Sequence, residues 1–493
     1  MRTIDPKAMQ RTEQSFMQKS GYPSLLLMEQ AAQRLYQHSL PYITAGKKCI
    51  VLCGTGNNGG DAYALARLLL RDGIACALYA AGEPGTEDAR CMRRLVVNLY
   101  GQEILPLEQL CLADACLVVD GLFGTGFHGA VKGDLARVIT RVNQSKIPVL
   151  AIDVPSGLDA RTGYVENVSL IAQETISFHR PKQGLFLSQA PLYTGKVSVA
   201  DIGIPAAFDV EPGIELIDHT AAKALLPRLS PIAHKGDMGR VLILAGSVNM
   251  AGAACLVAKG ARAAGGGLVT LASPAQCVAL VQQAEPTVMG FVLENEAQGQ
   301  ALLTRVPEQD CLVMGSGLDT DSRTKDLVRL CIETAKQAKI PCVLDAEALN
   351  LLAEQPQRLP EHFVLTPHPG EAARLLRCGI QDVLRDYVAA AEQLHAQYGG
   401  VIVLKGARTL LYDGRQYALN SSGSPVLAKG GSGDVLSGIL AALLAKSFLD
   451  TDLLHKAALG CYLLGRAGEL AAQRKGEYAG TALDALDLLS LAL

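Results

Sequence analysis

Two glycine-rich loops, each carrying an aspartate, are the segments of this chain best suited to chemistry. The first is CGTGNNGGD, which ends at Asp61, and the second is AKGGSGDVLSG, which contains Asp434. Each precedes a helical pattern, so its backbone N–H groups would meet at a helix N-terminus, where anions bind. Glycine lets a phosphate approach without meeting a Cβ. A carboxylate repels phosphate there, so the aspartates indicate catalysis or ligand orientation at two nucleotide sites.

Further oxygen donors follow strands of the first half. Asp120 ends the apolar run CLVVD, and Asp153 and Ser156 lie in AIDVPSG. Together with Asn57, Asn58 and Asp61 of the first loop they could hold a cation against a pyrophosphate. GTGNNG and GTGFHG both match G-x-G-x-x-G, but one sheet would not use two such loops for one dinucleotide, and Glu83 is a poorly placed ribose ligand. Plain turns with capping side chains are the alternative interpretation.

Three motifs of the second half could act on a phosphate. TPHPGE (Thr366–Glu371) displays His368 between two prolines that stiffen the loop. Glu371 falls at a helix start, where it could serve only as a cap. KGART (Lys405–Thr409) offers N–H, hydroxyl and cationic groups to a nucleotide. Asp434 could take a proton from a hydroxyl that attacks phosphorus, and a simple N-cap is the alternative.

The elements that must position these residues alternate between strand and helix in both halves. Short runs such as KKCIVLCG, CLVVDGLFG and PVLAIDVPSG read as buried strands, and GRVLILAGS, CLVMGSGLD and GVIVLKGART repeat the pattern later. Helical patterns between them predict parallel sheets in two α/β domains. Ligands of such sheets bind at the carboxyl ends of the strands, where the polar residues lie. Proline-rich IPAAFDVEPGIEL places the boundary, giving domains of residues 1–215 and 216–493.

Composition limits the classes of partner and location. Hydrophobic residues make up 49% of the chain, and the net charge of −3 provides no basic field for nucleic acid or an anionic membrane. Thirteen cysteines occur without a C-x-x-C pair, as is typical of reduced core thiols. The N-terminus lacks the apolar region of a signal peptide, and no run is long enough to span a bilayer. We therefore expect a cytoplasmic protein.

The first half resembles the NAD(P)H-hydrate epimerase family, which has a Rossmann-like three-layer αβα fold. CGTGNNGGD, VVDGLFGTGFHGAVKG, AIDVPSGLDARTG and GKVSVADIGIP carry the resemblance. It implies a potassium ion held by Asn58, Asp120 and Ser156, and Asp153 as a catalytic, substrate-contacting residue. The substrate-binding residues that it implies are Asn57, Asn58, Gly59, Gly60, Asp61, Gly124, Thr125, Gly126, Phe127, His128, Gly129, Ala130 and Asp153.

One residue of the first loop departs from that family. Ala62 stands where glycine is usual, and we expect its Cβ to lie near the ligand. The acid and base of the epimerisation are not assigned by the motifs, although Asp153 and Lys182 are candidates. The reaction would open the ring or pass through an iminium.

The second half resembles the ADP- or ATP-dependent NAD(P)H-hydrate dehydratases of the ribokinase-like superfamily. HKGDMGRVLILAGS, MAGAA, VLDAEALNLL, LTPHPGEAARLL, KGART and GGSGDVLSGI carry this resemblance, while GSGLD puts Ser316 where proline is common. The resemblance implies a ribokinase-like αβα fold with Asp434 as catalytic base. The hydrated nucleotide would contact Ala253, Gly317, His368 and Asp434. The adenine nucleotide would contact Lys405, Gly406, Ala407, Arg408, Thr409 and Gly433.

Together the resemblances imply a bifunctional repair enzyme for hydrated NAD(P)H. The first domain would convert the R hydrate to the S hydrate, and the second would dehydrate the S hydrate with ADP, releasing AMP and phosphate. Mg²⁺ would serve the dehydratase and K⁺ the epimerase. We expect a homo-oligomer, since related domains associate; ADP against ATP, and NADH-hydrate against NADPH-hydrate, stay open.

Two other functions explain part of the pattern. An ordinary small-molecule kinase of the same superfamily would share GGSGD and Asp434, but would leave TPHPGE and the first domain unexplained. Alternatively, the first half is a ligand-binding or scaffold module without catalysis.

Overall fold

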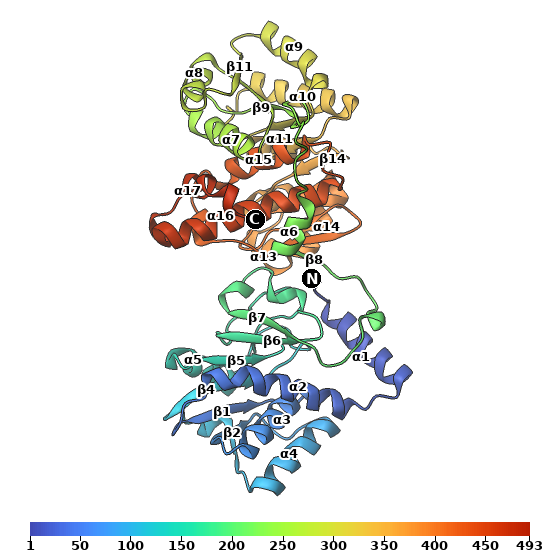
Figure 1. Ribbon diagram of the computed structural model, residues 1–493, viewed down its shortest axis with the longest axis vertical. Helices are drawn as coiled ribbons and strands as arrows, with labels where there is room; N and C mark the ends of the chain where they lie inside the picture. The colour runs from blue at the N-terminus through green and yellow to red at the C-terminus, as the bar shows by residue number, and fades with distance from the viewer. The chain divides into compact units, whose positions relative to one another are not determined.

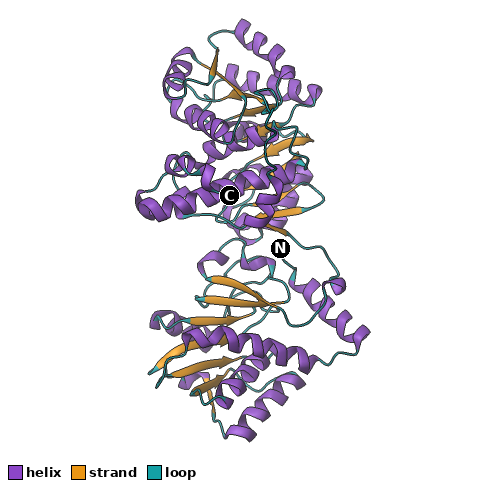
Figure 2. Cartoon of the chain, viewed as in Figure 1, coloured by secondary structure: helices purple, strands orange, loops and turns teal.

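The computed structural model describes all 493 residues, which form two compact units. The N-terminal unit is Arg2–Ile214, and the C-terminal unit consists of Met1 together with Glu215–Leu493. In each unit a sheet is flanked by helices, as Figures 1 and 2 show.

The N-terminal unit contains a sheet of seven strands in the order β3-β2-β1-β4-β5-β6-β7. All neighbouring strands are parallel. The strands are β1 (Lys48–Cys53), β2 (Cys76–Ala80), β3 (Ile104–Pro106), β4 (Ala115–Gly121), β5 (Val149–Ile152), β6 (Glu174–Phe178) and β7 (Lys196–Ala200).

Both faces of this sheet are buried. One core joins alternate residues of the strands to the first four helices, and a second lies on the opposite face with the fifth. This double burial explains why the central strands are apolar without alternation. The helices are α1 (Pro6–Ser20), α2 (Ser24–Ser39), α3 (Asn57–Arg71), α4 (Glu87–Tyr100) and α5 (Gly133–Ser145).

The C-terminal unit contains a sheet of ten strands in the order β11-β10-β9-β12-β13-β14-β15-β16-β17-β8. Only the pairs β15/β16 and β16/β17 are antiparallel. The strands are β8 (Glu215–Ile217), β9 (Arg240–Leu244), β10 (Leu268–Ser273), β11 (Met289–Val292), β12 (Cys311–Met314), β13 (Cys342–Leu344), β14 (Leu359–Leu365), β15 (Gly399–Leu404), β16 (Leu410–Tyr412) and β17 (Tyr417–Asn420).

The largest core of this unit packs the sheet against α7, α15, α16 and α17. The backbones of α7 and α15 approach closely, because a Cβ on Gly260 would lie 2.4 Å from the Val435 oxygen and one on Gly438 would lie 2.0 Å from the Val257 oxygen. The helices are α6 (His219–Leu225), α7 (Ala251–Ala263), α8 (Ala275–Ala284), α9 (Glu296–Arg305), α10 (Ser322–Ala338), α11 (Glu347–Glu354), α12 (Pro369–Leu376), α13 (Ile380–Arg385), α14 (Tyr387–Tyr398), α15 (Ser432–Leu444), α16 (Leu453–Ala479) and α17 (Ala482–Asp487).

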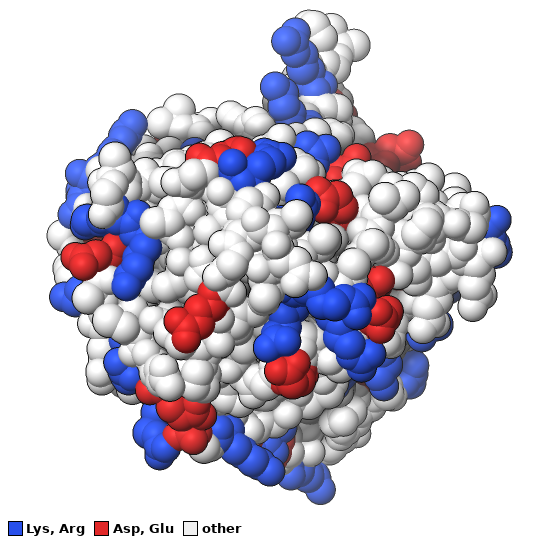
Figure 3. All heavy atoms as spheres, turned by 90° about the horizontal axis from the view of Figure 1, so that it is seen from below, with Lys and Arg blue, Asp and Glu red and all other residues white.

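The α/β fold class and the main parallel strands expected from the sequence are confirmed. The short strands β3, β8, β11, β16 and β17 were not expected. All thirteen cysteines are free, and most are buried. No helix has the length and apolar character needed to cross a membrane. Lys and Arg alternate with Asp and Glu over the face drawn in Figure 3, with no broad field of one sign.

Candidate active sites

In the N-terminal unit, the first glycine loop forms a tight turn from β1 into α3. The helix begins at Asn57 after the N-cap Gly56, so the NNGG segment is its first turn. A Cβ on Gly59 would lie 2.0 Å from the Gly54 carbonyl oxygen, and one on Gly54 would lie 1.9 Å from the Leu122 oxygen. Close backbone packing therefore requires glycine at both positions. The expected helix N-terminus is confirmed, and its first N–H groups lie at the carboxyl end of β1.

Asp120, Ser156 and Asn58 are brought together beside this turn. Asp120 accepts hydrogen bonds from Ser156 Oγ at 2.6 Å, Ser156 N at 2.7 Å and Leu122 N at 3.2 Å. Asn58 Nδ2 donates to the Phe123 oxygen at 2.7 Å, which leaves its amide oxygen available. Burial raises the pKa of Asp120 to about 6, although the hydrogen bonds from Ser156 and Leu122 oppose the rise.

No Lys, Arg or His side chain pairs with the fully buried carboxyl of Asp120. A buried carboxylate needs a compensating positive charge. The donors around it are carboxylate, hydroxyl and amide oxygens, which suit a hard cation. These residues therefore fit the potassium site that the sequence resemblance implies.

Asp153 lies directly after β5 in a left-handed backbone conformation, with φ of 62°. Aspartate tolerates this conformation better than most residues. Its Oδ1 accepts from Lys182 Nζ at 2.5 Å, Ser177 Oγ at 3.0 Å and Phe178 N at 3.1 Å. Lys182 is only 1% exposed. Three donors thus hold one carboxylate oxygen of Asp153, and the other oxygen has no protein donor.

A second carboxylate pair completes this part of the site. Burial raises the pKa of Asp61 well above its ordinary value, and Asp153 and Glu13 raise it further. Burial also raises the pKa of Glu13, on α1, to about 7, with Lys182 opposing and Asp153 adding to the rise. Glu13 was not among the site residues expected from the sequence. The available signal was its place between the apolar Met9 and Phe16 at helical spacing.

The GTGFHGA loop, residues 124–130, lies at the surface next to α3. A Cβ on Gly124 would lie 3.3 Å from the Cβ of Asn58. The rings of Phe123 and Phe127 stack with centroids 4.5 Å apart, and His128 Nδ1 lies 2.7 Å from Asp159 Oδ2. The structure therefore places the two glycine loops side by side, as one ligand site requires. Thr125, Gly126, Gly129 and Ala130 are at least partly exposed in the same loop.

The expectation for Ala62 is wrong. Ala62 is fully buried, and a Cβ on Gly121 of β4 would lie 2.6 Å from its methyl group. The methyl group packs against the sheet because Ala62 is one residue past Asp61 on α3. The alanine adds no group to the ligand side of the turn.

In the C-terminal unit, the second glycine loop leads into α15. Its N-cap is Gly431, with φ of 94°, and Asp434 is the third residue of the helix without a side-chain capping bond. The capping interpretation of Asp434 is therefore wrong. Burial raises the pKa of Asp434 to about 6; the Ser316 hydroxyl and Lys405 lower it, and Asp345 raises it.

A buried ion pair stands beside this helix start. Lys405 Nζ lies 2.8 Å from Asp345 Oδ1, which also accepts from Thr366 Oγ1 at 2.8 Å. Ser437 Oγ donates to Asp345 Oδ2 at 2.8 Å. Burial opposes ionisation of Asp345, but Lys405 and the two hydroxyls lower its pKa. Asp345 was part of the quoted VLDAEALN motif, yet it was not among the expected site residues.

The ammonium of Lys405 also faces the anion site of α15. A Cβ on Gly433 would lie 3.5 Å from Lys405 Nζ, and Glu371 Oε2 lies 3.8 Å from it. Burial opposes the charge of Lys405, but Asp345 and Glu371 raise its pKa, as does Asp434. Three carboxylates thus converge on one cation next to the helix N-terminus.

His368 is the N-cap of α12. Its Nδ1 accepts from Gly370 N at 3.0 Å and Glu371 N at 3.3 Å, and Glu371 Oε2 accepts from His368 N at 2.8 Å. The capping interpretation of Glu371 is confirmed. Since Nδ1 accepts, the ring proton is assigned to Nε2, which the exposed side chain offers to a ligand.

The other expected residues lie around this centre. A Cβ on Gly317 would lie 2.8 Å from the Cβ of Ala253, so these two residues are in close contact. Gly317 also follows the buried Ser316, which lies beside Asp434. In KGART, Gly406 and Ala407 are exposed, Thr409 is buried, and the Nη1 of the half-buried Arg408 has no hydrogen-bond partner.

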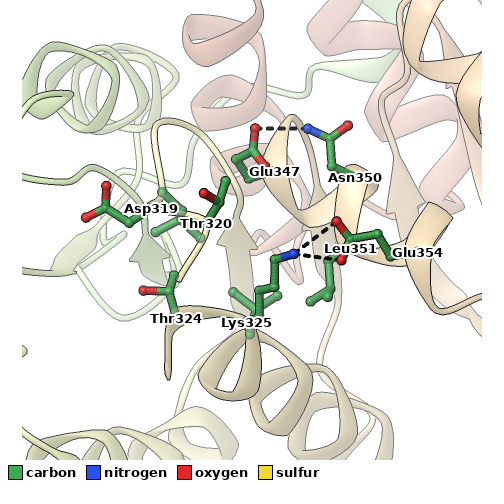
Figure 4. Close-up of a pocket in the computed structure, with 10 residues that line it drawn as sticks. Asp319, Thr320, Thr324, Lys325, Glu347, Asn350, Leu351 and Glu354 are labelled. Atoms are coloured by element: carbon green, nitrogen blue, oxygen red, sulfur yellow. Dashed lines mark hydrogen bonds and ion pairs between the residues drawn. The ribbon is translucent and has the colours of Figure 1, made fainter. Parts of the chain in front are cut away.

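A small recess next to this centre does not hold the nucleotide. It lies between α10 and α11 and encloses about 20 Å³, which is room for about one water molecule. Figure 4 shows Lys325 paired with Glu354, and Asn350 bonded to Glu347, across its wall. Glu347 thus lines this recess, where it accepts a hydrogen bond from Asn350.

Comparison with known proteins gives matches over nearly the whole chain. Residues 24–184 match a family described as YjeF-related protein N-terminus, and residues 241–490 match one described as NAD(P)H-hydrate dehydratase. The bifunctional NAD(P)H-hydrate repair enzyme Nnr of Moorella thermoacetica is 37% identical, with 96% of this chain and 92% of the relative covered. The enzyme of the same name from Escherichia coli is 33% identical, with 94% and 88% covered.

A solved structure resembles the C-terminal unit. It is an ADP/ATP-dependent NAD(P)H-hydrate dehydratase from Bacillus subtilis, co-crystallised with ATP and Mg²⁺. The two share 27% sequence identity with a TM-score of 0.50, and the match covers 57% of this chain and 98% of that one.

Proposed function

The chain belongs to the family of bifunctional NAD(P)H-hydrate repair enzymes, and from this premise we propose how its residues perform the two reactions. It is an enzyme with NAD(P)H-hydrate epimerase and NAD(P)H-hydrate dehydratase activities. We assign the epimerase to residues 1–215 and the dehydratase to residues 216–493.

In the dehydratase, Asp434 acts as the general base. It takes the proton of the C6 hydroxyl of the S hydrate, and that oxygen forms a bond to the terminal phosphorus of ADP while AMP leaves. The ring nitrogen then expels phosphate from C6, and a proton leaves C5, which gives NAD(P)H. Phosphate is a far better leaving group than hydroxide, so the nucleotide supplies the driving force.

The surroundings of Asp434 support this role. Its third position on α15 puts it beside the helix N–H groups that would hold the phosphates, and Lys405 Nζ faces Gly433 at the same point. We therefore place Lys405 on the terminal phosphates and the exposed Gly406 and Ala407 on the adenosine. His368, Ala253 and Gly317 contact the hydrated nucleotide.

This centre fits a magnesium ion whose ligands come from both the protein and the phosphates. Asp345, Glu371 and Asp434 supply hard carboxylate oxygens, and no cluster of three protein ligands closes a site by itself. Glu371 would orient the ion through water. The ion, when bound, neutralises charge that develops on the phosphates.

In the epimerase, the two glycine loops hold the hydrated nucleotide across the carboxyl ends of β1, β4 and β5. Asn57 to Asp61 and Gly124 to Ala130 bind the nucleotide, and Asp153 contacts the reacting ring. Asn58, Asp120 and Ser156 would hold potassium, which would supply the positive charge that buried Asp120 lacks. R hydrate would become S hydrate here and pass to the dehydratase.

The observation that carries the dehydratase proposal is the convergence of Asp345, Glu371 and Asp434 on Lys405 at the start of α15. Product analysis tests it against the kinase alternative. With S hydrate, the account predicts one AMP and one free phosphate for each NAD(P)H. A stable phosphorylated product would instead indicate an ordinary kinase. The same assay with ATP decides the preferred nucleotide, and light scattering checks the expected homo-oligomer.

A further inference from the structure

The N-terminal helix α1 is fixed directly to the epimerase site. Ile4 forms a parallel bridge to Lys182: its N–H donates to the Pro181 oxygen at 2.9 Å, and Gln183 N donates to the Ile4 oxygen at 3.1 Å. Asp5 then caps α1. The helix therefore starts a few residues from a backbone pairing with the lysine that holds Asp153.

One carboxyl group of this helix faces the site. Met9 and Phe16 are on the buried face of α1, and Glu13 lies between them at helical spacing from both. Glu13 interacts electrostatically with Lys182 and Asp153, and Asp61 on α3 interacts with Glu13 in turn. Two further carboxyl groups, Glu13 of α1 and Asp61 of α3, thus lie near Asp153.

We propose that Glu13 is the proton donor of the epimerase and that Asp153 is its base. The inference rests on the epimerase assignment above and names the acid and base that the motifs left open. Lys182, previously a candidate for one of these roles, is instead the positioning residue that holds Asp153.

The surroundings of the two carboxyls differ. The pKa of Glu13 is raised to about 7, mainly by burial, so much of it stays protonated near neutral pH. Asp153 has a buried ammonium 2.5 Å from one oxygen and two further donors, which stabilise its negative charge. A buried carboxyl that stays protonated, next to a carboxylate paired with a lysine, is suited to acid and base roles.

The chemistry balances with water as the only other reactant. Glu13 gives its proton to the C6 hydroxyl, which leaves as water while the N1 electron pair forms the C6–N1 double bond. Another water adds to C6 from the opposite face as Asp153 takes its proton. One water leaves and one is added, and the proton moved from Glu13 to Asp153 returns through solvent. The reverse reaction uses the same groups with their roles exchanged.

The charged groups that face Glu13 are Lys182, Asp153 and Asp61, and Asp88 of α4 acts on Asp61. The single cation among them is already paired with Asp153. Burial disfavours the ionised form of Glu13 more strongly than Lys182 favours it. The epimerase rate should fall as pH rises through about 7, because the donor loses its proton.

The test compares Glu13→Gln and Glu13→Asp with Glu87→Gln in the full-length chain. Glu87 is an exposed glutamate of α4, so its variant is a matched control. Interconversion of R and S NADPH-hydrate is followed by chromatography, and dehydration of S hydrate is measured in the same preparation. We expect about 100-fold slower epimerisation in Glu13→Gln, partial activity in Glu13→Asp with the alkaline decline retained, and unchanged dehydration in all three.

Isotope exchange gives an independent readout. In ¹⁸O-labelled water, each epimerisation should replace the C6 oxygen by a solvent oxygen. Epimerisation within threefold of wild type in Glu13→Gln, an unaltered pH profile, or epimerisation without oxygen exchange would overturn the proposal. A wild-type chain that dehydrates S hydrate but never interconverts R and S would instead remove the epimerase assignment itself.

Discussion

Lys405 Nζ lies 2.8 Å from Asp345 Oδ1, in a pair whose carboxyl side chain is 3% exposed. Replacing Lys405 by methionine would leave a buried carboxylate without its cation. We expect a loss of about 3–5 kcal/mol of unfolding free energy from the C-terminal unit. Dehydration should also be lost, since the phosphate site loses its positive charge. Urea unfolding followed by circular dichroism measures the first effect.

Lys325→Met is the control for that variant. Lys325 pairs with Glu354 in the same unit, but both side chains are about one-third to one-half exposed. Its loss should cost less than about 1 kcal/mol. Adding Asp345→Asn to Lys405→Met should restore much of the stability without restoring activity. Equal losses from the buried and the exposed pair would contradict this account.

The pH dependence of dehydration should report Asp434. Its pKa is raised to about 6, and a general base must be ionised, so the rate should decline below about pH 6 and level off above it. The Ser316 hydroxyl lowers this pKa, so Ser316→Ala should move the decline to higher pH. Steady-state rates with S hydrate from pH 5 to 8 measure both. A midpoint unaffected by Ser316→Ala would show that the hydroxyl does not act on the base.

Potassium should stabilise the N-terminal unit in a pH-dependent way. The pKa of Asp120 is raised to about 6 by burial, so without a cation the stability contributed by this group is lost as pH rises through about 6. Potassium binds the ionised form and offsets that loss. We expect K⁺ to raise the melting temperature by about 4 °C at pH 8 and much less at pH 5.

Choline chloride at equal ionic strength is the reference salt for that measurement, and Asp120→Asn is the matched variant. The amide cannot ionise, so its melting temperature should not depend on K⁺. A K⁺ effect of the same size in Asp120→Asn would exclude Asp120 as a ligand.

Glu13→Gln should stabilise the protein against unfolding while it slows epimerisation. The folded pKa of about 7 exceeds the ordinary 4.5, so the stability contributed by this group is present below about pH 4.5 and lost as pH rises through 7. Glutamine does not ionise, and the variant should therefore gain about 2 kcal/mol over wild type at pH 8 and nothing at pH 4.5. Urea unfolding at the two pH values checks this. A gain that did not vary with pH would point to packing rather than charge.

Site residues at the ends of strands were easier to predict from the sequence than site residues on other elements, such as Glu13 on α1. Asp120 lies at the end of β4 and Ser156 follows β5. Parallel strands end at one edge of the sheet, so the meeting of these two residues could be expected. Glu13 gave only a weak signal. An acidic residue on the apolar face of a helix does not reveal which partner it faces, and its partners lie far along the chain.

The same limit explains only some of the missed strands. β16 and β17 flank Asp413-Gly414, a dipeptide typical of hairpins, so this pair was predictable. β8 pairs with β17, about two hundred residues away, and three residues carry too little pattern to show it. Asp345 belongs to the VLDAEALN motif, but its role in the site depends on the ion pair with Lys405. Only the folded sheet brings these two residues together.

The most direct test of the account is the recovery of reduced nicotinamide from a mixture of R and S NADPH-hydrate. The full chain is supplied with ADP, Mg²⁺ and K⁺, and the near-ultraviolet absorbance of NADPH is followed to completion. The account predicts full recovery, abolished by Asp434→Asn and slowed after the S fraction by Glu13→Gln. Recovery that stops at the S fraction in wild type would contradict the epimerase assignment, and no recovery with either ADP or ATP would contradict the dehydratase.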